Sequence, residues 1–204
     1  IKKAKTCHGI LLDRGPFLSV DQANELNDSQ KELPKYLDNN EASAGTFIDV
    51  ISRQWSWEFK YPEGFSSSEL HIPIDEKVYF RLISKDVIHG FYIPAFRLKQ
   101  DIIPGSIISY SLTPTRKGTY RLRDSMFSGA YFSQNQTNVI VESKDAYQEW
   151  INKTVKKVPV DGLNQAGFLY KKRLEKGDKG WATISPSPSP QVNDPGNPDS
   201  PHEG

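Results

Sequence analysis

The sequence predicts an all-β sandwich or barrel between residues 46 and 143. β-Branched and aromatic residues gather in short runs, and Pro, Gly and polar residues separate these runs. Aromatic and polar residues also alternate strictly over residues 55–61, as they do in a strand with one buried face. One face would carry Trp55, Trp57, Phe59 and Tyr61, and the other would carry Ser56, Glu58 and Lys60.

Eight runs in this region are expected to form strands, because each is short and rich in β-formers. In chain order they are Phe47–Ile51, Trp55–Tyr61, Leu70–Pro73, Val78–Ile83, Gly90–Ile93, Ile107–Leu112, Gly118–Leu122 and Asn138–Val141.

The flanking segments differ from this central region. Residues 1–45 are polar and show no sustained period, although an amphipathic helix is predicted over Val20–Leu37, limited by Pro34. Residues 144–184 are predicted to form a helical extension. Ser143 would cap its first helix, and Ala146, Tyr147, Trp150 and Ile151 fall at helical spacing.

A second, weaker helical pattern covers Ala166–Glu175. Residues 185–204 are dominated by Ser-Pro repeats and by Asn, Asp, Pro and Gly. This composition predicts an extended, disordered tail and favours a solvated spacer over a ligand for a proline-binding module.

Composition excludes several classes of protein. The 204 residues hold 26 Lys+Arg and 25 Asp+Glu, a formal net charge of +1, which argues against a nucleic-acid binder. The single cysteine, Cys7, rules out a disulfide framework, and the Cys7–His8 pair lacks the second cysteine needed for haem attachment. No apolar run approaches the ~20 residues that span a bilayer. No nucleophile–base pair is evident, so no catalytic residue is predicted.

Three segments carry a specific resemblance. Ser84–Gly105, the aromatic segment Gln54–Tyr61 and the segment Arg116–Tyr120 together resemble the copper-A domain of cytochrome c oxidase subunit II. The likeness extends over about Phe47–Ile151, in order and with similar spacing. It implies a cupredoxin-like Greek-key β-barrel on the extracytoplasmic face of a haem–copper oxidase, in the periplasm or the thylakoid lumen. It also implies a transmembrane hairpin before the domain, which we expect upstream of Ile1.

The metal loop of that family departs from its pattern here. The family places Cys-x-x-x-Cys-x-x-x-His-x-x-Met after an earlier His, and two bridging thiolates hold two copper ions. His89 matches the earlier His. At the other positions Asp124 and Ser128 replace the cysteines, Phe132 the second His, Asn135 the Met, and Met126 a Glu that helps to hold magnesium.

A count of ligands predicts that this domain binds no metal. One thiol, Cys7, cannot bridge two coppers, and a single-copper cupredoxin site also needs a Cys near a second His. A zinc site of His89, Asp124 and Ser128 is the alternative, but a hydroxyl is a poor zinc ligand. We therefore expect His89 to be a hydrogen-bonded structural residue.

Two further positions take their meaning from the resemblance. Trp55 matches the residue at which the family accepts electrons from cytochrome c, a role that is vestigial without copper. The alternative for Trp55 is simple packing in the barrel. Asp101 matches a segment that faces subunit I in the family. It is therefore expected either to contact subunit I or to lie in a turn that has no such role. Ser106 stands where the family usually has Arg, which weakens any expectation of a contact with haem propionates.

Copper-less versions of subunit II accompany oxidases that take electrons from quinol. The resemblance therefore implies subunit II of a quinol-type haem–copper terminal oxidase, a structural part of a complex that reduces dioxygen to water. Haem and copper are expected in subunit I, the partners are subunits I and III, and binding of cytochrome c is not expected. The segment Gly180–Thr183 and the Pro-rich tail are most similar to alternative respiratory oxidases of cyanobacteria. The alternatives are a non-enzymatic binding module on a cupredoxin scaffold and a cytochrome c docking subunit.

Overall fold

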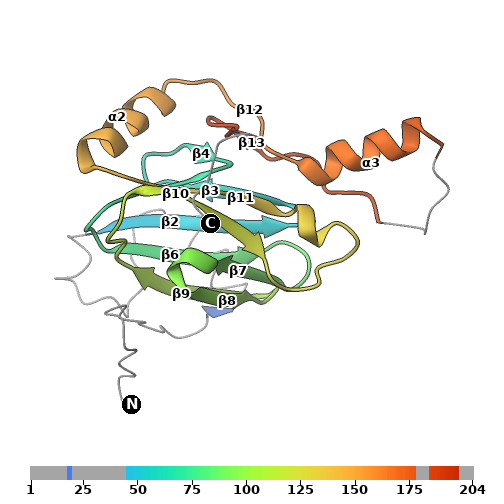
Figure 1. The fold of residues 1–204 in the computed structure, drawn as a ribbon, viewed down its shortest axis with the longest axis horizontal. Coiled ribbons are helices and arrows are strands. Elements are labelled where there is room, and N and C mark those ends of the chain that lie inside the picture. The colour runs from blue at the N-terminus through green and yellow to red at the C-terminus, as the bar shows by residue number, and fades with distance from the viewer. Residues whose placement is uncertain (1–17, 20–44, 178–183, 198–204) are drawn as a thin grey trace, which may run out of the picture.

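The computed structural model describes residues 18–19, 45–177 and 184–197, which form two facing β-sheets with two peripheral helices (Figure 1). The strands are β1 (Leu18–Ser19), β2 (Thr46–Arg53), β3 (Ser56–Lys60), β4 (Ser66–Ser67), β5 (Leu70–Pro73), β6 (Val78–Ser84), β7 (His89–Ile93), β8 (Leu98–Ile102), β9 (Ser106–Leu112), β10 (Gly118–Asp124), β11 (Gln136–Glu142), β12 (Val160–Asp161) and β13 (Gln191–Val192). The helices are α2 (Lys144–Thr154) and α3 (Gln165–Glu175), and η1 (Pro94–Phe96) and η2 (Phe132–Gln134) are short 3-10 turns.

The sheets enclose one main core. The first sheet has the order β1-β9-β6-β2-β3-β4 and the second the order β5-β11-β10-β7-β8. β2 and β6 are parallel neighbours although the chain between them passes through β5, so the connection crosses from one sheet to the other. Within β6, Val78, Phe80 and Leu82 alternate into the core, as a half-buried strand requires.

All eight predicted strands are confirmed, and the structure adds β8 and four two-residue strands, β1, β4, β12 and β13. β8 was not predicted because Lys99, Gln100 and Asp101 interrupt its apolar pattern. The strand lies at the edge of its sheet, where polar side chains can face water.

Trp55 corrects the predicted alternation. Trp57, Phe59 and Tyr61 lie in the main core, but Trp55 precedes β3 and belongs to a separate small cluster with Tyr131 and Ala166. On the predicted polar face Ser56 and Glu58 are also buried, whereas Lys60 is exposed.

The expectation of a disordered tail is wrong for residues 185–197. β13 pairs with β12, Val192 is fully buried, and the Asp194 carbonyl accepts a 2.8 Å hydrogen bond from Ser68 N. This segment is held mainly by hydrogen bonds to the barrel, which a search for apolar residues does not detect. The predicted helix at 20–37, Cys7, the segment 180–183 and residues 198–204 lie outside the described residues.

The two predicted helices are present. Ser143 caps α2 by accepting a hydrogen bond from Ala146 N, and Tyr147 and Ile151 bury one face of this helix in the core. Among the described residues, neither helix has the length and apolar character that crossing a bilayer demands.

Candidate functional site

The loop that corresponds to the metal loop of the family lies at one end of the second sheet. His89 is the first residue of β7 and Asp124 the last residue of β10, and Asp124 pairs with Phe91 across the two strands. Residues 125–135, which include η2, then fold over this end before β11 begins (Figure 1). The sheet register therefore brings the loop and His89 to the same rim.

Asp124 is the centre of a buried hydrogen-bond cluster at this rim. Its carboxylate joins β7 to the loop, and the donors include both side chains and backbone amides, which satisfy the buried charge. The donors to its two oxygens are His89 Nδ1 at 2.7 Å, Gly90 N at 2.8 Å, Ser128 Oγ at 2.8 Å, Met126 N at 3.0 Å and Asn135 Nδ2 at 3.2 Å.

His89 lies between two carboxylates and is fully buried. Its Nε2 is 2.7 Å from Asp86 Oδ1, opposite the contact of its Nδ1 with Asp124. Burial alone would lower the pKa of His89, but the hydrogen bonds and negative charges of Asp124 and Asp86 outweigh it, so this pKa is raised. Burial would raise the pKa of both carboxyl groups, yet hydrogen bonds from His89 and from backbone amides lower it. These directions favour the protonated form of His89, held between two carboxylates.

The remaining positions of the loop are held in different ways. The Asn135 carbonyl accepts hydrogen bonds of 3.0 Å from both Trp57 Nε1 and Asp124 N, which fixes the loop's return into β11. Met126 reaches Asp124 only through its backbone amide. Phe132 does not join the cluster, and its ring centre lies 5.3 Å from that of Phe127.

The residues at this rim do not fit a copper-A centre. Such a centre needs two thiolates, and the described part of the chain contains no cysteine. Both ring nitrogens of His89 lie 2.7 Å from carboxylate oxygens, so both already have hydrogen-bond partners within the protein. No group of three or more potential metal ligands occurs among the described residues.

Trp55 lies beneath the C-terminal extension. Its side chain is only 1% exposed, its Nε1 donates to the Ser128 carbonyl at 3.1 Å, and its ring meets the edge of Tyr131 at 5.3 Å. Ala166 of α3 is fully buried against this pair. The residue at the predicted electron-entry position is therefore covered by α3.

Asp101 lies near exposed apolar side chains at the same rim. Its carboxylate is half-exposed and 3.9 Å from Lys99 Nζ in the edge strand β8. Because His89 pairs with Ile102, the flanking Ile88 and Ile103 are neighbours just beyond the ends of β7 and β8. These two residues and Phe127, which is 80% exposed, are called the apolar tips below.

Sequence reasoning missed two parts of this site. Asp86 was not recognised as the second partner of His89, although a carboxylate three residues before a histidine in one loop was a visible signal. Tyr131 was not recognised as the link between Trp55 and α3, and no local pattern indicates that long-range contact.

Comparison with protein families gives one match in this region. The family described as cytochrome C oxidase subunit II, periplasmic domain, matches residues 65–144, which include His89, Asp124 and the loop.

Known proteins with related sequences carry two kinds of name. The chain is 40% identical over 104 residues to cytochrome c oxidase subunit 2 of Thermostichus vulcanus, covering 50% of this chain and 32% of that protein. It is 26% identical over 114 residues to quinol oxidase subunit 2 of Bacillus spizizenii, covering 55% of this chain and 36% of that protein. The chain thus spans about a third of the length of these relatives.

Among solved structures, the periplasmic domain of subunit II of cytochrome oxidase from Bradyrhizobium japonicum has a similar fold. The TM-score is 0.51 at 22% identity, covering 54% of this chain and 93% of that domain. This likeness concerns the fold alone, and it confirms the predicted all-β, cupredoxin-like architecture.

Proposed function

The chain belongs to the cytochrome c oxidase subunit II family, and from that premise we propose that it is the extramembrane domain of subunit II in a haem–copper terminal oxidase that lacks copper-A and oxidises quinol. In this proposal the complex reduces dioxygen to water, haem and copper reside in subunit I, and this subunit has a structural role. The domain would lie on the extracytoplasmic side of the membrane.

The observation that carries the proposal is the position of Asp124. By the family resemblance Asp124 stands at the position of a bridging cysteine, and its carboxylate joins His89, Ser128 and Asn135 by direct hydrogen bonds. A hydrogen-bonded cluster of this kind holds the loop without any metal, and it offers no redox-active group. Quinol can deliver electrons within the membrane. It is therefore a suitable donor for a complex in which this domain does not relay electrons.

The burial of Trp55 supports the same conclusion. A soluble donor protein would need to approach this aromatic group closely, yet Tyr131 and α3 cover it. We therefore propose that cytochrome c is not the electron donor of this complex.

The apolar tips support a structural contact with subunit I. Ile88, Ile103 and Phe127 are exposed around the rim, where they would otherwise face water. Asp101 lies beside them in β8 and adds one charge to this surface. We propose that this rim rests on the extramembrane surface of subunit I, with Asp101 at its border.

The decisive experiment is turnover of the purified complex. We expect oxygen consumption with a ubiquinol analogue and none above background with reduced cytochrome c. Trp55→Phe keeps an aromatic ring in the cluster and should leave quinol turnover unchanged, because no electron passes through it.

Two results would overturn the proposal. One is oxygen consumption driven by cytochrome c, lowered by Trp55→Phe. The other is stoichiometric copper in the 204-residue chain, with the visible absorption of a thiolate-bridged pair of ions.

A further inference from the structure

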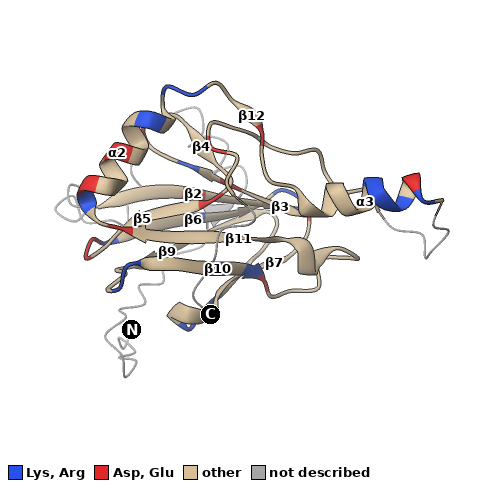
Figure 2. Ribbon diagram, turned by 45° about the horizontal axis from the view of Figure 1, so that its top comes forward, with Lys and Arg blue, Asp and Glu red and all other residues tan. Residues whose placement is uncertain are grey.

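Much of the surface of α3 is exposed and makes no contact with the barrel. Only its first part packs on the barrel, around Ala166, and all residues from Lys171 to Gly177 are exposed. Figures 1 and 2 show the helix extending beyond the end of the barrel. Its outer half therefore exposes most of its surface, apart from the contact of Arg173 with Tyr131.

This helix is held in a fixed position. Asn164 Oδ1 accepts from Gly167 N at 2.7 Å and its Nδ2 donates to the Ser187 carbonyl at 2.9 Å. Near the other end, Arg173 Nη1 donates to Tyr131 Oη at 3.3 Å, with its guanidinium 5.5 Å from the centre of that ring. The exposed surface is thus presented at a defined place.

The exposed surface is basic. The segment 165–177 contains four basic residues and one acidic residue, Glu175, and the blue of Lys and Arg marks the outer half of the helix ribbon in Figure 2. The basic residues are Lys171, Lys172, Arg173 and Lys176. A concentration of positive charge on a projecting helix favours an anionic partner.

Large apolar side chains lie among these charges. Phe168 is 66% exposed and Leu174 is 62% exposed, so neither contributes much to the core. Phe168 precedes Lys171 and Lys172 by three and four residues, which places all three on one side of the helix. Apolar side chains beside basic ones can enter the interfacial layer of a bilayer while the charges meet its headgroups.

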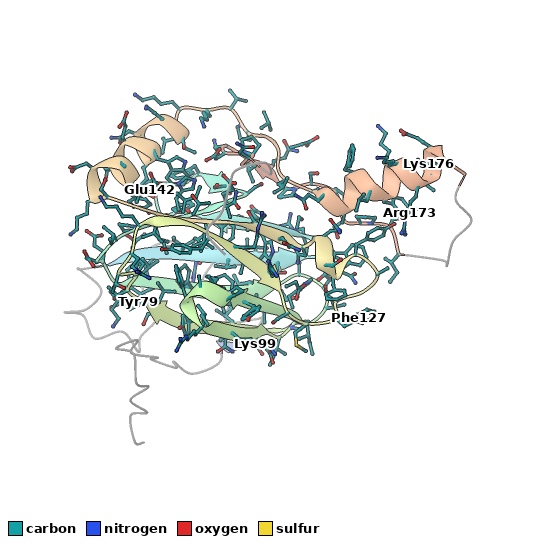
Figure 3. All side chains as sticks on the ribbon, viewed as in Figure 1. Tyr79, Lys99, Phe127, Glu142, Arg173 and Lys176 are labelled. Carbon is teal, nitrogen blue, oxygen red and sulfur yellow. The ribbon has the colours of Figure 1, made fainter. Side chains whose placement is uncertain are left out.

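The place of α3 in the fold is consistent with a membrane surface. The cluster that holds α3 packs against Phe132, and the ring of Phe132 contacts Phe127. Figure 3 shows Phe127 and Arg173 at the same end of the molecule. If the apolar tips rest on subunit I, α3 projects beside that subunit, where lipid headgroups lie.

We infer that the exposed surface of α3 binds the anionic surface of a phospholipid bilayer. Lys171, Lys172 and Lys176 contact phosphate groups, and Phe168 enters the interfacial layer. The orientation of α3 in this inference rests on the proposed function. A bilayer is favoured over an acidic protein because α3 is a single convex helix that mixes apolar and basic side chains.

The test is co-sedimentation of the 204-residue chain with phosphatidylcholine vesicles, with and without phosphatidylglycerol. We expect binding only with phosphatidylglycerol, and weaker binding as salt rises. Lys171→Gln with Lys172→Gln should weaken binding about thirtyfold, because each basic residue near an anionic surface contributes about one kilocalorie per mole. Phe168→Ser should also weaken it.

Matched controls separate α3 from general charge and hydrophobicity. Lys117→Gln with Lys156→Gln removes the same charge from exposed sites elsewhere, and Val158→Ser alters a side chain that is 79% exposed. Both controls should bind like the wild type. The inference is overturned if the chain binds no vesicles, if it binds phosphatidylcholine equally well, or if the α3 variants match their controls. It is also overturned if α3 crosslinks to protein and not to lipid in the complex. Turnover with quinol does not test these side chains, so a failure of vesicle binding can be told apart from a failure of the proposed function.

Discussion

The imidazole of His89 and the carboxylate of Asp124 form a buried ion pair, with Nδ1 and Oδ2 2.7 Å apart and neither side chain exposed to solvent. The pair links the start of β7 to the end of β10, and it fixes the loop that follows β10. Removing His89 leaves the carboxylates of Asp86 and Asp124 without their shared counterion, and removing Asp124 leaves its buried donors without an acceptor.

Asp124→Ala should lower the free energy of unfolding by about 3–5 kcal/mol, because His89 and the loop donors lose their shared acceptor. Urea unfolding measures the change. Asp101→Asn is the control: its ion pair with Lys99 is long and exposed, so a change within about 0.5 kcal/mol is expected. Equal effects of the two substitutions would contradict the central role of Asp124.

Stability should fall as pH rises above about 6.5. The pKa of His89 is raised on folding. The protonated histidine therefore stabilises the fold fully at a pH below its pKa in the unfolded chain. This stabilisation is lost as the pH rises through its pKa in the folded protein. The pKa values of Asp86 and Asp124 are lowered, so their effect is complete above about 4 and is lost as pH falls further. Urea unfolding at a series of pH values from about 5 to about 9 should show that the free energy of unfolding declines with rising pH. The decline should be smaller in His89→Gln than in the wild type. An identical decline in both proteins would exclude His89 as its source.

A copper-A site should be restorable at this rim. Asp124, Ser128 and Asn135 already converge on one point with His89, so side chains with soft ligand atoms would meet there. The variant combines Asp124→Cys, Ser128→Cys, Phe132→His and Asn135→Met, with Met126→Glu as an option. After copper loading it should turn purple and give the electron paramagnetic resonance signal of a mixed-valence pair.

The control for that variant adds His89→Ala, which should weaken copper binding or change its spectrum. A variant that folds, as judged by circular dichroism, but binds no copper would show that the loop is aligned wrongly with the family pattern.

Gly129 should be irreplaceable because of Trp55. Its φ is +120°, and an added Cβ would lie 2.7 Å from Cζ2 of the indole ring. Gly64 also has a positive φ, +86°, but nothing lies within 4 Å of an added Cβ there. Gly129→Ala should therefore cost about 1–3 kcal/mol more than Gly64→Ala in urea unfolding. Equal costs would mean that backbone conformation alone matters, and that Trp55 can move aside.

The parts of the fold that the sequence could predict are those with a local pattern. Alternation revealed the central strands, and Ser143 marked the start of α2. The cluster around His89 could be anticipated only as a set of positions, because its pairing with Asp86 depends on how a loop closes. Strand β8 carries too many polar residues to show alternation. The C-terminal segment is held by long-range hydrogen bonds and one valine, which produce no period in the sequence.

That valine, Val192, should determine whether residues 184–197 stay on the barrel. It is fully buried, while the adjacent Asp194 accepts a 2.8 Å hydrogen bond from Trp150 Nε1. Val192→Asn removes the apolar contacts of the valine and buries an amide in their place. We expect it to lower the free energy of unfolding by about 2–4 kcal/mol. Limited proteolysis should then cut within residues 184–197, and Trp150 fluorescence should change as its partner leaves. Val158→Asn, at a site that is 79% exposed, should change stability by less than about 0.5 kcal/mol. If the segment is cut equally fast in the wild type, it is not bound to the barrel in solution, because Val192 would then be accessible without any substitution.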